Sequence, residues 1–145
     1  MLSNNKGNIK SIKSKEEVLT YIAKLNYALE STSTLLQFQL DRFTDKERDK
    51  RHTNRFTIGE LFPNENPSIS IKQELLKLNI NEYIETVKDL RFPKRSEFWV
   101  FGRLYNTGNV YIKLRVDIIE RINVFVISFH YSTDDLKSLK FPYRK

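Results

Sequence analysis

The sequence contains no cysteine, which excludes a disulfide framework, a thiolate metal site and a cysteine nucleophile. Its only histidines are His52 and His130, so a zinc site with the usual nitrogen and sulfur ligands is not expected. It also lacks a phosphate-binding loop, a dinucleotide fingerprint, and the GxSxG, HExxH and EF-hand patterns. These absences predict a protein that works without a metal ion or another cofactor.

Long hydrophobic runs are absent as well. The first ten residues, MLSNNKGNIK, lack the apolar segment of a signal peptide, and no later run approaches the length of a membrane-spanning helix. We therefore expect a cytoplasmic protein with no membrane partner. The 145 residues suffice for one domain with its own hydrophobic core, spanning 1–145, but not for two.

Positive charge is in excess. Lys and Arg number 25 against 18 Asp and Glu, for a formal net charge of +7. Such a balance favours a polyanionic partner, either a nucleic acid or an acidic protein. Many small lysine-rich proteins are basic without such a partner, so the placement of the charge is more informative than its total.

The N-terminal part, residues 14–52, has a helical pattern. Ser14 and Glu17 form a capping-box signature. Apolar residues then recur at spacings of three and four, which predicts one long amphipathic helix. The run Ser31–Thr34 is weak helix material and could bend this helix or split it into a hairpin. The apolar stripe is either a core face or a surface for a homodimer or a partner helix; its members are Val18, Ile22, Leu25, Leu29, Thr32, Leu36, Leu40 and Phe43.

Residues 41–55 mix both charge signs densely, which is typical of a solvated segment and not of a binding site. Prolines and asparagines in 59–70 then mark a boundary loop before an α+β part, residues 68–145. Two short helices are expected there. The second, 81–90, would be capped by Asn81 and stopped by Phe92-Pro93.

Three runs rich in β-branched and aromatic residues follow between Phe98 and Tyr131, which predicts an antiparallel meander. Residues 106–108 suit a three-residue hairpin loop, so Tyr105 would pair with Asn109. One sheet face would then be charged and aromatic, and the other almost wholly apolar. The charged face would carry Trp99, Phe101, Arg103, Tyr105, Tyr111, Lys113 and Arg115.

Between Glu85 and Asp117 there are seven basic residues and only two acidic ones, Asp89 and Glu97. Cations interleaved with aromatic rings can hold phosphates and stack on unpaired bases, as an RNA-binding surface requires. The chemistry open to such a face is metal-free cleavage of RNA by the ribose 2′-OH. Equally, the face could be polar and aromatic only because strands favour tyrosine. His130, at the end of a strand, is either structural or catalytic.

The segment FWVFGRLYNTGNVYIKLRV…NVFVISFHYS resembles the C-terminal part of the MqsR toxin family, within the RelE-like group of bacterial toxins. The likeness lies in a Trp, a turn with Gly, then the runs 110–113 and 124–129. It implies a small α+β protein that cleaves mRNA, with or without the ribosome, and is neutralised by a cognate antitoxin. The active Tyr of the family falls on Tyr111. Its active Gln falls on Val100, and its active Lys falls between Glu85 and Lys88.

Together these observations predict a RelE-like α+β fold: a long N-terminal helix or helical hairpin, short helices, then an antiparallel sheet of three or more strands. They predict a growth-inhibiting toxin acting on RNA as a metal-independent endoribonuclease. The alternatives are a non-catalytic nucleic-acid- or protein-binding module and a phage or mobile-element regulator that acts through its N-terminal helix. We expect catalytic roles for Tyr111, Lys113, Arg103 and His130, and RNA-binding roles for Lys88, Arg91, Lys94, Arg95, Trp99, Tyr105 and Arg115.

Overall fold

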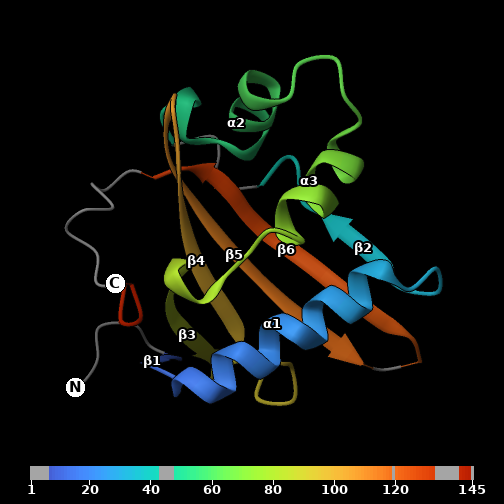
Figure 1. The fold of residues 1–145 in the computed structure, drawn as a ribbon, viewed down its shortest axis with the longest axis vertical. Coiled ribbons are helices and arrows are strands. Elements are labelled where there is room, and N and C mark those ends of the chain that lie inside the picture. The colour runs from blue at the N-terminus through green and yellow to red at the C-terminus, as the bar shows by residue number, and fades with distance from the viewer. Residues whose placement is uncertain (1–6, 43–47, 119, 133–140, 145) are drawn as a thin grey trace.

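A computed structural model describes residues 7–42, 48–118, 120–132 and 141–144. Within them the chain is α+β: a six-stranded mixed sheet in the order β1-β3-β4-β5-β6-β2, with three α-helices packed on one face (Figure 1). No helix of this described part is long and apolar enough to cross a membrane. In chain order the elements are β1 (Asn8–Ser11), α1 (Lys15–Glu30), β2 (Leu35–Phe38), η2 (Lys50–His52), α2 (Asn54–Leu61), α3 (Pro67–Leu75), η3 (Ile80–Glu82), β3 (Tyr83–Asp89), β4 (Phe98–Tyr105), β5 (Gly108–Ile118) and β6 (Ile122–Tyr131), where η denotes a 3₁₀ turn.

The predicted start of the first helix is confirmed, but its predicted length is wrong. Ser14 Oγ accepts a hydrogen bond from the Glu17 N–H, and the Glu17 side chain accepts one from the Ser14 N–H. The helix ends at Glu30 because Ser31 is extended. The hydroxyl-rich run after it competes for backbone hydrogen bonds and does not extend the helix.

Residues 35–38 form an edge strand, so no helical hairpin exists in the described N-terminal part. β2 runs parallel to β6, with Leu35 opposite Asn123 and Phe38 opposite Val126. The sheet is therefore mixed, and the predicted antiparallel RelE-like arrangement behind a long helix or hairpin is wrong, whereas the α+β class is confirmed. Leu36 and Leu40, which were expected on the apolar stripe of the helix, still pack against the hydrophobic core. A short strand can place apolar side chains there as well as a helix can.

A second strand, β3, occupies most of the predicted helix 81–90. Asn79, not Asn81, caps the 3₁₀ turn η3, and the chain then becomes extended from Tyr83. Strand β3 pairs with β4 on one side and with β1, part of the expected frayed arm, on the other. The apolar residues at 83, 84 and 87 fit the period of a helix. They also fit a strand that is buried on both faces and has a bulge between Tyr83 and Glu85.

Two hydrophobic clusters lie on opposite faces of the sheet. The larger one fills the space under the helices, where Val18, Ile22 and Leu25 of α1 are buried. Tyr21 of α1 stacks on Trp99 with ring centroids 3.9 Å apart. The smaller cluster is built on Ile84, Val87, Phe98 and Val100. We call the face that carries the smaller cluster the open face, because the described helices cover the other one (Figure 1).

The β4–β5 register differs by one residue from the predicted one. Tyr105 pairs with Gly108, so the hairpin loop has two residues and Arg103 lies opposite Val110. Tyr111 lies opposite Gly102. Because side chains alternate along a strand, this shift divides the predicted charged face: Arg103 points toward the helices, whereas Tyr111 lies on the open face.

Candidate functional site

The open face carries a cavity of about 360 Å³ that is lined by several basic residues. Residues of four strands, β1, β3, β5 and β6, line it together with residues of the adjoining segments. These strands are far apart in the sequence. Of the ten described residues that line the cavity, four are cations and one is a carboxylate. The lining residues are Lys10, Arg42, Arg48, Ile84, Glu85, Tyr111, Lys113, Ser128, His130 and Ser132.

Strand geometry explains why the central residues of this cavity converge. Tyr111 and Lys113 are two residues apart on β5 and so share a face. They lie opposite His130 and Ser128 of β6, respectively. A register shift follows at Ile127, which has no partner on β5 and separates the two halves of β6. Because of this bulge, Val126 before it and Phe129 after it both point toward the helices. Ser128 and His130 therefore point toward the cavity.

Lys113 is the central cation of this site. It is half-buried, and no carboxylate of the described residues lies within ion-pair distance of its ammonium group. Burial lowers the pKa of Lys113, and the nearby Arg42 guanidinium lowers it further. A partly desolvated ammonium group without a carboxylate partner is a strong attractor for an anionic ligand.

Tyr111 and His130 form a stacked pair beside Lys113, with ring centroids 5.6 Å apart and an interplanar angle of 25°. Burial raises the pKa of Tyr111 to about 12, with a contribution from the Glu85 carboxylate. Tyr111 therefore keeps its hydroxyl proton at neutral pH. The Nδ1 atom of His130 lies 3.0 Å from the Tyr131 carbonyl oxygen. Because that oxygen can only accept, Nδ1 carries the hydrogen, and Nε2 is the ring nitrogen that can take up a proton.

The remaining cations reach the cavity from outside the meander. Arg42 donates from Nη1 to Ser128 Oγ at 3.1 Å. The Lys10 ammonium of β1 lies 3.4 Å from the Glu85 carboxylate, and Glu85 is the one acidic residue in the described lining. The described part of the lining therefore keeps a positive balance even after this ion pair is counted.

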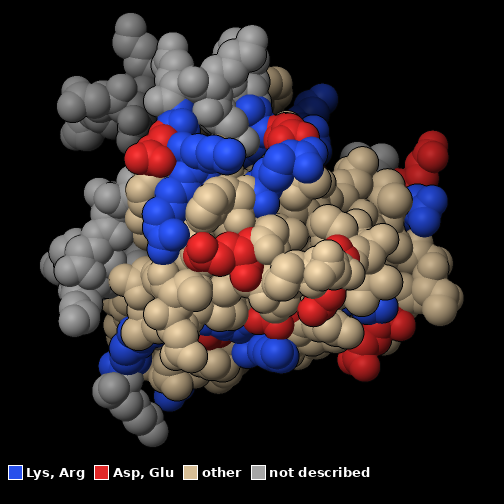
Figure 2. All heavy atoms as spheres, turned by 90° about the horizontal axis from the view of Figure 1, so that it is seen from above, with Lys and Arg blue, Asp and Glu red and all other residues tan. Residues whose placement is uncertain are grey.

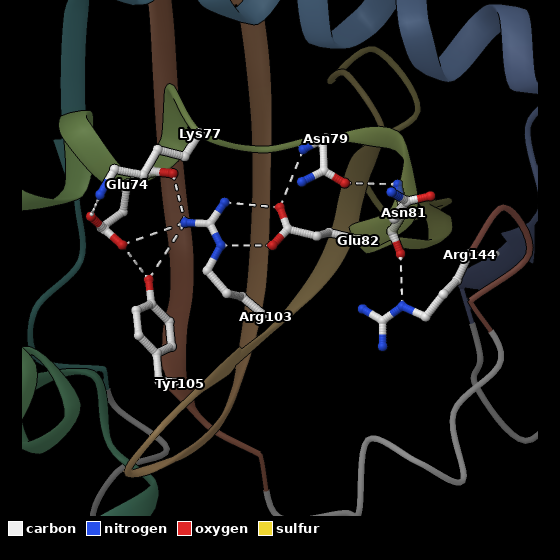
Figure 3. A network of polar contacts seen from close by, with 8 residues as sticks. All are labelled: Glu74, Lys77, Asn79, Asn81, Glu82, Arg103, Tyr105 and Arg144. Atoms are coloured by element: carbon white, nitrogen blue, oxygen red, sulfur yellow. Dashed lines mark hydrogen bonds and ion pairs between the residues drawn. The ribbon is translucent and has the colours of Figure 1, made fainter.

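Arg103, predicted as catalytic, lies on the other side of the sheet (Figure 3). Its guanidinium donates two hydrogen bonds to Glu82, at 2.7 and 2.9 Å, and one to the Glu74 carbonyl. The Tyr105 hydroxyl donates to the Glu74 carboxylate. Burial alone would lower the pKa of Arg103, but the hydrogen bonds to Glu82 raise it. Arg103 is 9% exposed and saturated with partners, so its geometry is that of a structural residue.

Most of the other predicted RNA-binding residues have local structural partners. Trp99 is stacked on Tyr21, and the hydroxyl of Tyr105 is bound to Glu74. Lys88 donates to two carbonyls of the loop between β3 and β4, and Arg91 pairs with Asp89. The structure brings three predicted residues into the cavity and leaves the others outside. Those inside are Tyr111, Lys113 and His130, and those outside are Arg103, Lys88, Arg91, Lys94, Arg95, Trp99, Tyr105 and Arg115.

The sequence analysis missed Lys10, Arg42 and Arg48. Lys10 lies in the expected frayed arm, which instead pairs with β3. Arg42 and Arg48 lie in the mixed-charge segment that was interpreted as solvated. Within that segment the carboxylate of Asp41 pairs with Arg55, whereas Arg42 and Arg48 lie at the cavity. The local balance of charge in the sequence does not distinguish Arg42 and Arg48 from Arg55, because the difference depends on which side chains form ion pairs in the folded protein.

Seen from above, Lys and Arg side chains gather along one side of the molecule, and elsewhere they alternate with Asp and Glu (Figure 2). No group of three or more His, Asp or Glu side chains in the described ranges is placed to hold a metal ion. Comparison with protein-family models, with curated proteins and with solved structures finds no match. The geometry of the cavity is therefore the main guide to the function of the protein.

Proposed function

We propose that the protein binds RNA in the open-face cavity and cleaves it without a metal ion. The observation that supports this proposal is the convergence of Lys113, Tyr111 and His130 with Arg42 and Arg48 in one cavity. Such a set offers cations for a phosphodiester, a hydrogen-bond donor and a proton acceptor. These are the groups that attack by a ribose 2′-OH requires.

The proposed reaction balances without water or a cofactor. His130 Nε2 takes the proton of the 2′-OH, and the 2′ oxygen attacks the adjacent phosphorus. The bond between phosphorus and the 5′ oxygen breaks, and Lys113 gives a proton to that oxygen. The products are a 2′,3′-cyclic phosphate and a free 5′-hydroxyl. The lowered pKa of Lys113 suits it to proton donation near neutral pH.

In this reaction Tyr111 is a hydrogen-bond donor to the phosphate and not a base. Because its pKa is raised to about 12, the hydroxyl stays protonated and donates a hydrogen bond to a non-bridging phosphate oxygen. Stacking on Tyr111 fixes the orientation of the His130 ring. Arg42 and Arg48 stabilise the additional negative charge of the crowded phosphorus centre.

The proposed biological role is that of a toxin of a bacterial toxin–antitoxin system, acting in the cytoplasm on mRNA and held inactive by a cognate antitoxin. Its support is the resemblance of 98–132 to MqsR-like toxins, in which the active Tyr corresponds to Tyr111. A homodimer through the N-terminal helix is not part of the proposal, because the apolar stripe of α1 is buried against the sheet: Val18, Ile22, Leu25 and Leu29.

The test is cleavage of a labelled single-stranded RNA in EDTA by the wild type and by two variants. His130→Asn keeps a donor near the Tyr131 carbonyl but removes Nε2, and Lys113→Gln removes the ammonium group. Each is expected to lower the cleavage rate by about 10²- to 10⁴-fold. Lys72→Gln, at an exposed position of α3 on the other side of the sheet, is the matched control and should cleave normally.

Replacing the attacking 2′-OH by hydrogen should abolish cleavage while binding is retained. Induced expression should arrest growth for the wild type and for Lys72→Gln but not for His130→Asn. Cleavage that survives in both cavity variants, or wild-type protein that neither cuts RNA nor arrests growth, would contradict the proposal.

A second candidate function is a non-catalytic nucleic-acid-binding regulator. The cationic lining of the cavity supports it, since Lys10, Lys113 and the two arginines can bind phosphates without any proton transfer. In that case RNA with and without the 2′-OH would bind equally, Lys113→Gln would weaken binding, and no cyclic phosphate would form.

A further inference from the structure

A second cationic position lies on the open face next to the cavity. Arg115 follows Lys113 by two residues on β5, so both side chains project from the same face about 7 Å apart along the strand. Both pack on one ring: the Lys113 ammonium is 5.0 Å from the centroid of Phe98, and the Arg115 guanidinium is 4.7 Å from it. The two cations are therefore neighbours over a common apolar base.

Arg115 shares a single carboxylate with a second arginine. Asp117 Oδ2 accepts a hydrogen bond from Arg95 at 3.0 Å and lies 3.1 Å from Arg115 Nε. Asp117 Oδ1 accepts from the Ser96 N–H. Two guanidinium groups against one carboxylate leave a positive excess. In the part of the chain that the structure describes, Arg115 Nε is a buried donor without a hydrogen bond of good geometry, so its pairing with Asp117 is incomplete.

The two arginines differ in access. The side chain of Arg115 is 12% exposed and packs between Phe98 and Phe125, whereas that of Arg95 is 47% exposed. Burial and then the charge of Arg95 lower the pKa of Arg115, whereas the carboxylates of Asp117 and Asp89 act in the opposite direction. Arg95 is thus the group that can reach a ligand, and Arg115 supplies fixed charge beneath it.

We propose that the open face holds a single-stranded RNA across two successive phosphates, one in the cavity at Lys113 and the next at the Arg95–Arg115–Asp117 cluster. This inference rests on the proposed function and adds the substrate class to it. The spacing of alternate residues on β5 is close to that of neighbouring phosphates in an extended single strand. The cavity has room for about one nucleotide and not for a duplex.

Recognition at the second position uses the RNA backbone and not the bases. Phe98 is 8% exposed because Lys113 and Arg115 cover it, so its ring is closed to a stacking base. Contacts of guanidinium groups with phosphates are independent of sequence. Oligonucleotides of different base sequence but equal length should therefore bind with similar affinity.

The test compares the salt dependence of binding for a dinucleotide, which has one phosphodiester, and an octanucleotide. Both carry 2′-O-methyl groups, which prevent cleavage. Each phosphate contact with a single strand contributes about 0.7 to the slope of log K against log salt concentration. Arg95→Gln should lower the octanucleotide slope by about 0.7 and leave dinucleotide binding unchanged. Lys113→Gln should weaken the binding of both oligonucleotides.

Asp117→Asn provides a test in the opposite direction. It keeps an acceptor for the Ser96 N–H but removes the charge that offsets the two arginines, so the octanucleotide should bind more tightly. Lys72→Gln should match the wild type in all measurements.

An octanucleotide slope unchanged in Arg95→Gln and lowered in Lys113→Gln would overturn the second phosphate position while leaving the cavity proposal intact. Tight binding of an eight-base-pair duplex, equal to that of the single strand, would also overturn it. Wild-type protein that binds neither oligonucleotide better than Lys113→Gln does would instead overturn the proposed function itself.

Discussion

Lys113 combines a role in the proposed chemistry with an unfavourable position for folding. Its pKa is lower in the folded protein than in the unfolded chain, so the folded state disfavours the ammonium form. The unfavourable contribution is fully present below the folded pKa and disappears as the pH rises from that value to the pKa of free lysine. Binding of an anion needs the ammonium form, so affinity should fall as the pH rises through this range.

We expect Lys113→Met to raise the free energy of unfolding by about 0.5–1 kcal/mol at pH 7, because it removes the cost of burying the ammonium group and its repulsion with Arg42. The same change should weaken RNA binding. Urea denaturation and oligonucleotide titration measure the two effects. Lys72→Met, at an exposed site, should stay within about 0.5 kcal/mol of the wild type. A Lys113→Met protein that is both less stable and unaltered in binding would argue against the charge assignment.

The packing of strand β4 against its neighbours depends on the absence of a side chain at Gly102. Gly102 lies in the middle of β4, and a Cβ there would come within 3.1 Å of the Ile84 and Phe141 side chains. Phe141, from the C-terminal segment, belongs to the small cluster of the open face. The glycine therefore lets this segment pack on the sheet.

Gly102→Ala should destabilise the protein by about 1–3 kcal/mol, the usual range for overpacking. The second change Phe141→Leu should recover part of the loss by making room for the new methyl group. Gly59→Ala in α2 is the control, since a Cβ there meets nothing within 4 Å and alanine favours a helix. Urea midpoints for the four proteins check this, and equal loss in both glycine variants would contradict the packing argument.

The sequence predicted strands well where a run is apolar and bounded by turns. The limits of β4, β5 and β6 follow from the stretch Phe98–Tyr131. It failed for β2 and β3, because short segments such as 35–38 and 83–89 satisfy helical and strand periods equally. Only pairing with distant strands decides between the two, and a single sequence does not reveal that pairing.

The register of the β4–β5 hairpin shows the same limit at the site. In the observed register, unlike the expected one, Arg103 lies on the largely apolar face that packs against the helices. Arg103 is tolerated there because Glu74 and Glu82 approach it from α3 and η3. Tyr111, Lys113 and His130 could be predicted from the sequence because they are polar residues on predicted strands. Lys10, Arg42 and Arg48 could not, because only the folded chain brings them to the cavity.

For the whole molecule, the buried network of Arg103 joins the sheet to the helical layer (Figure 3). Removing the guanidinium would leave the Glu82 carboxylate, 12% exposed, without its charged partner, whereas the Glu74 carboxylate would keep Lys77 and Tyr105. We expect Arg103→Met to destabilise the protein by about 3–5 kcal/mol, and Glu82→Gln in addition to restore part of it. Urea denaturation measures both. If Arg103→Met stayed as stable as the wild type but no longer cleaved RNA, the arginine would have the catalytic role that its structural partners argue against.

The parallel pairing of β2 with β6 has a consequence for the nascent chain. Leu35 and Leu36 leave the ribosome long before their partners Asn123 and Val124 do. Long-range strand pairing of this kind is slow, because a large loop must close before any contact forms. The cavity depends on the same late event, since β1 supplies Lys10 and β6 supplies His130. A ribosome translating this message therefore carries an incomplete sheet until β6 has emerged, and the cationic cavity forms only after that point.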